Sequence, residues 1–164
     1  MDLTGKRVVV TGGAGFVGSH LAERLAEEAA VTVVDDLSAG RREWVPAEAS
    51  FHEGDLTDST VLDRVIDEDV DLVCHLAAAK AVDAAAPRRQ FETNLEATYN
   101  VLERMDAVGV DRLLYTSSST VYGEAPRPTP EDYGPLEPIS AYGAGKLAEE
   151  GLVSTYAHSH GIQS

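Results

Sequence analysis

The stretch Val8-Val9-Val10-Thr11-Gly12-Gly13-Ala14-Gly15-Phe16-Val17-Gly18-Ser19-His20 decides the fold. A β-branched apolar run enters a glycine-rich turn, and residues 21–26 continue with helical spacing. A strand, a tight turn and a helix in this order can seat a pyrophosphate on the helix N-terminus. We expect Gly12 to take the backbone angles of the turn, Gly15 to let the main chain approach the phosphates, and Gly18 to let the helix pack closely. Taken alone, the glycine pattern also fits an ordinary strand-to-helix loop.

A second apolar run, residues 31–35, ends in the acids Asp35 and Asp36. Asp35 follows the glycine turn at the distance where an acid accepts hydrogen bonds from the adenosine ribose and repels a 2′-phosphate, which favours NAD over NADP. The pair Arg41-Arg42 weakens this preference, because arginines can hold a 2′-phosphate. Asp36 is a further cofactor-binding candidate, with a solvated or turn-capping role as the alternative.

Strand and helix patterns alternate along the rest of the chain. We expect strands over residues 6–11, 31–35, 50–52, 70–76 and 113–116, and helices over residues 16–28, 58–66, 87–107 and 140–160. The alternation predicts an α/β fold, a Rossmann-type doubly wound parallel sheet with strand order 3-2-1-4-5 and its ligand at the carboxyl ends of the strands. Gly109 is expected to end the third helix, and the proline-rich residues 123–138 to form a loop over the site.

Composition narrows the class of protein. The 164 residues suffice for one domain with a core, and no apolar run approaches the ~20 residues of a membrane span. The net charge of −15 argues against nucleic acid or an anionic membrane as a partner. It fits either an ordinary acidic protein or a halophilic one, in which salt screens the self-repulsion.

Targeting and metal signals are lacking in the sequence. No signal peptide precedes the first strand, so a cytoplasmic protein is expected. The single cysteine, Cys74, lies in an apolar run and is interpreted as a buried core residue. The histidines are scattered, and we expect no metal site.

Residues that can transfer a proton follow the fifth strand. Ser117-Ser118-Ser119 comes at the ligand end of the sheet, and the last helix begins with Tyr142 and Lys146 at i, i+4 spacing. An ammonium beside a phenol stabilises the phenolate and lowers the pKa of the tyrosine from about 10. Together with a serine hydroxyl, such a pair can move a proton at a substrate hydroxyl while a nicotinamide moves the hydride. In isolation, a Tyr-x-x-x-Lys pattern is commonly a surface helix.

In combination these motifs resemble the extended short-chain dehydrogenase/reductase family, in its group of NAD-dependent epimerases and dehydratases acting on nucleotide sugars. The resemblance covers nearly the whole chain. It rests on residues 11–18, Gly54-Asp55-Leu56, His75-Leu76-Ala77-Ala78, Asn94, residues 117–123, and the Tyr142 and Lys146 pair.

The resemblance implies roles for individual residues. Tyr142 would be the general acid/base, Lys146 would lower its pKa and bind the nicotinamide ribose of NAD, and Ser118 would be the hydroxyl partner. The other residues that the resemblance assigns to the cofactor are Phe16, Val17, Asp55, Leu56, Leu76, Ala77, Ala78, Lys80 and Asn94. The alternatives are a solvated loop position for Lys80 and a purely structural role for Asn94.

The serine-rich segment also indicates the type of reaction. Residues 118–122 resemble the sugar 4-epimerases, and the dehydratases of this group carry acids where this chain has Ser119 and Thr120. The implied reaction is transient C4 oxidation of a nucleotide sugar, most simply a UDP-sugar such as UDP-glucose or UDP-galactose. A nucleotide-sugar dehydratase or reductase is the alternative within the group.

The chain departs from the family in length, because full-length relatives are considerably longer. We therefore expect residues 1–164 to form an incomplete NAD-binding domain, truncated before the sixth strand and without the sugar-binding lobe. The fifth strand would then have an unpaired edge, and a homodimer or an aggregate would form there or through the two long helices. A non-catalytic NAD-binding or assembly module is the alternative function.

Overall fold

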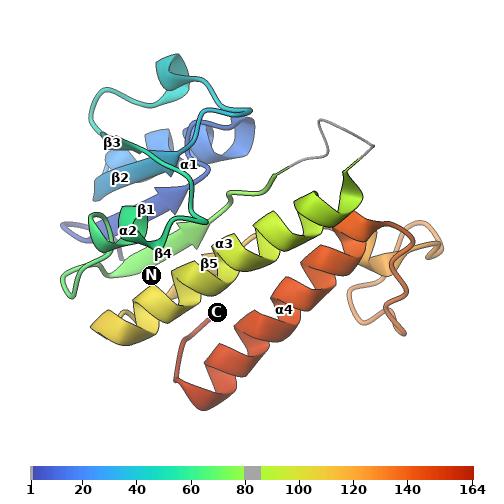
Figure 1. The fold of residues 1–164 in the computed structure, drawn as a ribbon. Helices are drawn as coiled ribbons and strands as arrows, with labels where there is room; N and C mark the ends of the chain where they lie inside the picture. Colours follow the sequence, from blue (N-terminus) through green and yellow to red (C-terminus); the bar gives the residue numbers. More distant parts are fainter. Residues whose placement is uncertain (1, 80–85) are drawn as a thin grey trace.

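Residues 2–79 and 86–164 are described by a computed structural model, which shows a parallel sheet between helices (Figure 1). The strands are β1 (Arg7–Thr11), β2 (Ala30–Asp35), β3 (Ser50–Glu53), β4 (Leu72–His75) and β5 (Leu113–Tyr115). The α-helices are α1 (Phe16–Ala26), α2 (Ser59–Asp63), α3 (Pro87–Val108) and α4 (Ala141–Ser159), and the 3₁₀ turns are η1 (Arg42–Trp44) and η2 (Ser119–Tyr122). None of these helices is long and apolar enough to cross a membrane.

The sheet confirms the predicted topology. Its order is β3-β2-β1-β4-β5 and every pairing is parallel. Thr11, at the end of β1, pairs with Val34 on one side and His75 on the other. The glycine turn, the acids after β2 and the segment after β4 therefore meet at one edge of the sheet.

The sheet separates two apolar cores, because neighbouring residues of a strand point to opposite faces. The core on the α1 side includes Val8, Val10 and Ala22. The core on the other side includes Val9, and it is covered by α2 and by the long helices α3 and α4, which lie side by side (Figure 1). The strand alternation thus specifies both faces at once. Cys74 is buried as predicted, and burial raises the pKa of its thiol to about 11.

The helix ends follow their sequence signals. Asp58 caps α2 by accepting from the Thr60 amide, and Ser140 caps α4 by accepting from the Gly143 amide. Gly109 ends α3 with a left-handed φ of 77°, as expected. The predicted helix over residues 58–66 is shorter than expected, because α2 ends at Asp63 and turns carry the chain onward.

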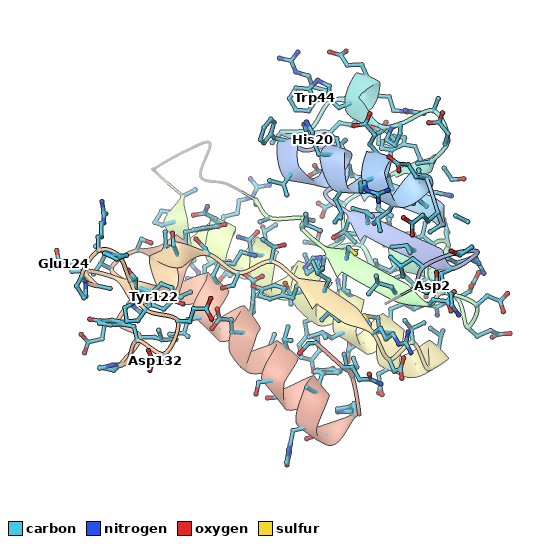
Figure 2. All side chains as sticks on the ribbon, turned by 180° about the vertical axis from the view of Figure 1, so that it is seen from behind. Asp2, His20, Trp44, Tyr122, Glu124 and Asp132 are labelled. Atoms are coloured by element: carbon cyan, nitrogen blue, oxygen red, sulfur yellow. The ribbon has the colours of Figure 1, made fainter. Side chains whose placement is uncertain are left out.

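Of two predictions about the C-terminal part, one was wrong and the other was only partly right. Residues 123–138 are irregular, but none of them lines the cavity described below, and they extend outward from the sheet (Figures 1 and 2). The edge of β5 is also not wholly unpaired. Leu113 donates its amide to the Gln163 carbonyl at 2.9 Å, and Gln163 bridges Arg112 in parallel. The chain was expected to be truncated before the sixth strand, but Gln163 already pairs beside β5, and the neighbouring Ile162 is buried.

Candidate functional site

The glycine turn leaves no room for side chains. Gly12 has a φ of 69°, and a Cβ there would lie 2.6 Å from the Ala77 amide nitrogen. A Cβ on Gly18 would overlap the Gly12 carbonyl oxygen, so close packing of α1 requires glycine there. Gly15 precedes α1 and offers no side-chain cap, so the first amides of α1 are available to an anion.

One cavity of about 450 Å³ lies at the carboxyl ends of the strands. Its volume is in the range of sites for small molecules and cofactors. The predicted site residues that line it are Gly12, Gly15, Phe16, Val17, Gly18, Asp35, Asp36, Asp55, Leu56, Leu76, Ala77, Ala78, Asn94, Tyr142 and Lys146. Ser118 does not line it, although Thr116 and Ser117 do. Lys80 lies outside the described residues. The structure thus brings nearly the whole predicted set around one space.

The two acids after β2 are held differently. Asp35 is buried, and its carboxylate accepts from the backbone amides of Ala14 at 3.0 Å and Leu37 at 2.9 Å. This ties the acid to the glycine turn and fixes its position at the cavity wall. Asp36 is exposed and caps its own turn by accepting from the amide and the hydroxyl of Ser38. The turn-capping alternative therefore describes the contacts of Asp36.

The neighbouring arginines stack on aromatic rings and do not line the cavity. The Arg41 guanidinium lies 5.1 Å from the Trp44 ring centroid, and the Arg42 guanidinium lies 4.5 Å from that of Phe51. Figure 2 shows Trp44 beside His20 at the start of α1. In this arrangement both guanidinium groups contact aromatic rings, and neither arginine is among the residues that line the cavity.

Helix α3 braces the segment that follows β4. The side chain of buried Asn94 accepts from the Ala79 amide at 2.6 Å and donates to the Ala79 carbonyl at 3.2 Å. Gln90, which sequence reasoning missed, donates to the same carbonyl at 3.0 Å. The cavity wall formed by this segment is therefore fixed by side chains one helical turn apart.

The start of α4 brings Tyr142 and Lys146 to the cavity. The buried Lys146 ammonium donates to the Tyr115 hydroxyl and to the Thr116 carbonyl, each at 3.3 Å. Ser118 is the N-cap of η2 and accepts from the amide and hydroxyl of Thr120. Ser118 also acts on Tyr142, because it lowers the pKa of the phenol.

The expected lowering of the Tyr142 pKa by Lys146 is not found in this structure. The pKa of Tyr142 is raised, first by burial of the phenol and then by the negative charge of Glu149, while Ser118 opposes the rise. The Lys146 ammonium was expected to stabilise the Tyr142 phenolate without an opposing charge. A carboxylate of Glu149 lies 3.1 Å from this ammonium.

Sequence reasoning missed Glu149, although a signal was present. Positions 142, 146, 149, 153 and 156 recur at intervals of four and three and share one face of α4. Val153 and Tyr156 on that face are buried, so an acid at 149 stands at a core position. Among the described residues no cluster of histidine, cysteine and acids could hold a metal.

Comparison with known proteins agrees with this geometry. The model of a family described as "NAD dependent epimerase/dehydratase family" matches residues 8–164. The UDP-glucose 4-epimerase of Azospirillum brasilense is 38% identical over 96% of this chain and 47% of its own length. The chain spans about half the length of the curated relatives that it matches.

Solved structures give the same result. A crystal structure of a UDP-galactose 4-epimerase superposes with a TM-score of 0.88 at 46% identity, over 96% of this chain and 53% of that one. The UDP-glucose 4-epimerase of Thermus thermophilus in complex with NAD superposes with a TM-score of 0.87 at 39% identity, over 96% and 52%. The likeness extends over nearly all of this chain and half of each neighbour.

Proposed function

Because the chain belongs to the NAD dependent epimerase/dehydratase family, we propose that it is the NAD-binding part of a nucleotide-sugar 4-epimerase acting on a UDP-sugar. The observation that carries the proposal is one cavity lined by the glycine turn, Asp35, Tyr142 and Lys146. The relatives and structural neighbours named above are UDP-glucose and UDP-galactose 4-epimerases. The absence of an acid at Ser119 and Thr120 disfavours dehydration.

The residues present fit a dinucleotide. The turn from Gly12 to Gly18 would hold the pyrophosphate against the first amides of α1, at positions where a side chain would obstruct it. Asp35 would accept from the adenosine ribose, and Asp55 would border the adenine. The Asp35 carboxylate would repel a 2′-phosphate, and neither arginine lines the cavity, so NAD is favoured over NADP.

Tyr142 would move the proton. When bound, NAD would supply the hydride chemistry, because it can accept the hydride from C4 of the sugar and later give it back. The Tyr142 phenolate would take the 4-hydroxyl proton as the 4-keto sugar forms, and the phenol would return it after the sugar has turned over. Ser118 would bind the same substrate oxygen, and Lys146 would orient the nicotinamide ribose by exchanging one of its two 3.3 Å hydrogen bonds for a bond to the ribose.

Two measurements test this proposal. Calorimetry should show NAD binding, with weaker binding of NADP, and Tyr142→Phe should keep NAD affinity because the phenol oxygen is lost without loss of shape. Turnover of UDP-galactose is then measured with the chain alone and with the C-terminal half of a relative supplied separately. Turnover that depends on Tyr142 supports the epimerase. NAD binding without turnover under both conditions favours an NAD-binding or assembly module, and failure to bind NAD contradicts both.

The domain organisation and assembly are part of the same proposal. Residues 1–164 would form the cofactor domain, and residues that hold the sugar nucleotide would come from a further lobe. A homodimer would form through α3 and α4, where Tyr99 is 42% exposed. Light scattering on a concentrated sample should give a dimer mass, and a monomer at all concentrations would contradict this assembly.

A further inference from the structure

Glu149 is a buried carboxylate that the chemistry above does not use. It is fully buried on α4, and its Oε2 accepts from Lys146 Nζ at 3.1 Å, Thr98 Oγ1 at 2.7 Å and the Tyr115 hydroxyl at 3.0 Å. One carboxylate oxygen thus accepts from three donors, one of which is an ammonium. The other oxygen, Oε1, is buried and receives no hydrogen bond from the residues that the structure describes. The charge of Glu149 is therefore held almost entirely by the groups around Oε2.

Three hydrogen bonds hold the Lys146 ammonium in this arrangement. An ammonium has three donors, and here they go to Glu149, the Tyr115 hydroxyl and the Thr116 carbonyl. The side chains of Lys146 and Glu149 are only 3% and 1% exposed, so solvent screens the pair little. The carboxylate consequently offsets the positive charge that would otherwise stabilise a phenolate at Tyr142.

The hydrogen bonds beyond Glu149 run in a single direction. Thr98 has one hydroxyl proton and gives it to Glu149, so its oxygen accepts from His75 Nε2 at 3.0 Å. His75 Nδ1 then accepts from the Thr11 hydroxyl at 2.7 Å, and Thr11 accepts from the Ala77 amide at 3.3 Å. Every donor points from the cavity wall towards the carboxylate.

The titratable neighbours are consistent with this direction. Burial lowers the pKa of His75 to about 3, so the imidazole is neutral and can accept at one nitrogen and donate at the other. Burial and the charge of Glu149 raise the pKa of Tyr115, which remains a donor. The groups that titrate around the Tyr142 and Lys146 pair are Tyr115 on β5, His75 on β4, and Glu149 and Glu150 on α4, while α3 contributes the non-titrating Thr98.

We propose that Glu149 is a positioning residue for proton transfer: it ends this directed chain, anchors and offsets the Lys146 ammonium, and thereby sets the pH at which Tyr142 ionises. The role of Glu149 in proton transfer rests on the proposed function. The contacts of Glu149 with Lys146 and Thr98 do not depend on that function. The role can therefore be tested without NAD and without substrate.

The first test compares Glu149→Gln with Glu150→Gln, which removes the same charge one residue further along α4 and contacts Ser117 instead of Lys146. Tyrosine is labelled with carbon-13 at Cζ, the Tyr142 signal is assigned with Tyr142→Phe, and phenolate formation is followed by NMR. In Glu149→Gln the first proton should leave the Tyr142 and Lys146 pair at a pH about one unit lower than in the parent chain. Glu150→Gln should shift it much less. An unchanged titration in folded Glu149→Gln overturns the proposal.

The second test needs no substitution at Glu149. Nitrogen-15 NMR of the unchanged chain should show His75 as the neutral Nε2–H tautomer at neutral pH. The Nδ1–H tautomer or a charged ring would reverse or break the chain and overturn the proposal, even if Glu149→Gln does not fold. Calorimetry with NAD on the same samples separates the two ideas. Absence of NAD binding in the parent chain would contradict the proposed function. An unchanged titration in Glu149→Gln, or the other His75 tautomer, would contradict only the role of Glu149.

Discussion

At the scale of single residues, Gly18 determines how closely α1 approaches the turn before it. A Cβ there would overlap the Gly12 carbonyl oxygen. Gly18→Ala should therefore displace the turn, lower the free energy of unfolding by about 2 kcal/mol and weaken NAD binding by about tenfold or more. Urea unfolding and calorimetry measure the two effects.

The matched control is Gly151→Ala in α4, where a Cβ meets no atom within 4 Å. Alanine should raise stability there by about 0.5–1 kcal/mol, because glycine is the poorer residue in a helix. NAD affinity should not change. Equal effects of the two substitutions would contradict the close packing assigned to Gly18.

His75 makes the stability of the fold depend on pH. Its pKa is about 3 in the folded chain and about 6.5 in the unfolded chain, so the unfolded state binds more protons between these values. Stability from this group is present above pH 6.5 and is lost as the pH falls. We expect it to cost about 2 kcal/mol between about pH 7 and pH 5.

Urea unfolding at several pH values measures this loss. His75→Gln keeps a donor in place of Nε2 and does not titrate, so the dependence should flatten in that variant even if its absolute stability is lower. The same slope in both proteins would show that other groups cause the acid sensitivity.

At the scale of elements, the first turns of α4 contain Tyr142 and Lys146, and the N-cap Ser140 stabilises the start of this helix. Ser140 accepts from the Gly143 amide at 3.0 Å, two residues from Tyr142. Ser140→Ala should cost about 1 kcal/mol and fray the turn that positions the phenol. Asp58→Ala removes the cap of α2 at a similar cost.

The two cap variants should differ in function. NAD binding should weaken more in Ser140→Ala than in Asp58→Ala, because Tyr142 and Lys146 line the cavity and no residue of α2 does. Thermal melting and calorimetry on both variants check this. A larger loss of affinity in Asp58→Ala would contradict the importance of the α4 cap.

Local patterns were sufficient to predict most elements and their order. The strand order and the end of α3 at Gly109 depend on periodicity and backbone preference, which are properties of short segments. The position of residues 123–138 depends on distant packing, and the expectation of a loop over the site was wrong. Prolines predict that a segment is irregular, but they do not predict where it lies.

The candidate site was predictable as a set of residues but not in its electrostatics. Residues from the turn, from the ends of β2 and β4, and from α4 line one cavity. The pKa of Tyr142 could not be inferred from the Tyr142 and Lys146 spacing, because the buried Glu149 lies beside the ammonium. The Tyr-x-x-x-Lys motif specifies only the tyrosine and the lysine, so it does not report an acid on the buried face of the same helix.

At the scale of the whole molecule, the charge of −15 on 164 residues makes the folded state repel itself. Added KCl shortens the screening length to about 3 Å at 1 M and should raise the melting temperature. NaCl at equal ionic strength should give the same rise if screening is the cause. A melting temperature that is the same in dilute and molar salt would contradict adaptation to high salt.

The separation of the two cores also bears on how this sequence can change over time. Val9 and Val10 are adjacent in the chain, yet Val9 belongs to the core under α3 and α4, and Val10 belongs to the core under α1. A substitution at either position alters the packing of a different set of helices. Each side of the sheet can therefore accumulate compensating substitutions independently, and drift beneath α1 need not disturb the side that supports Tyr142.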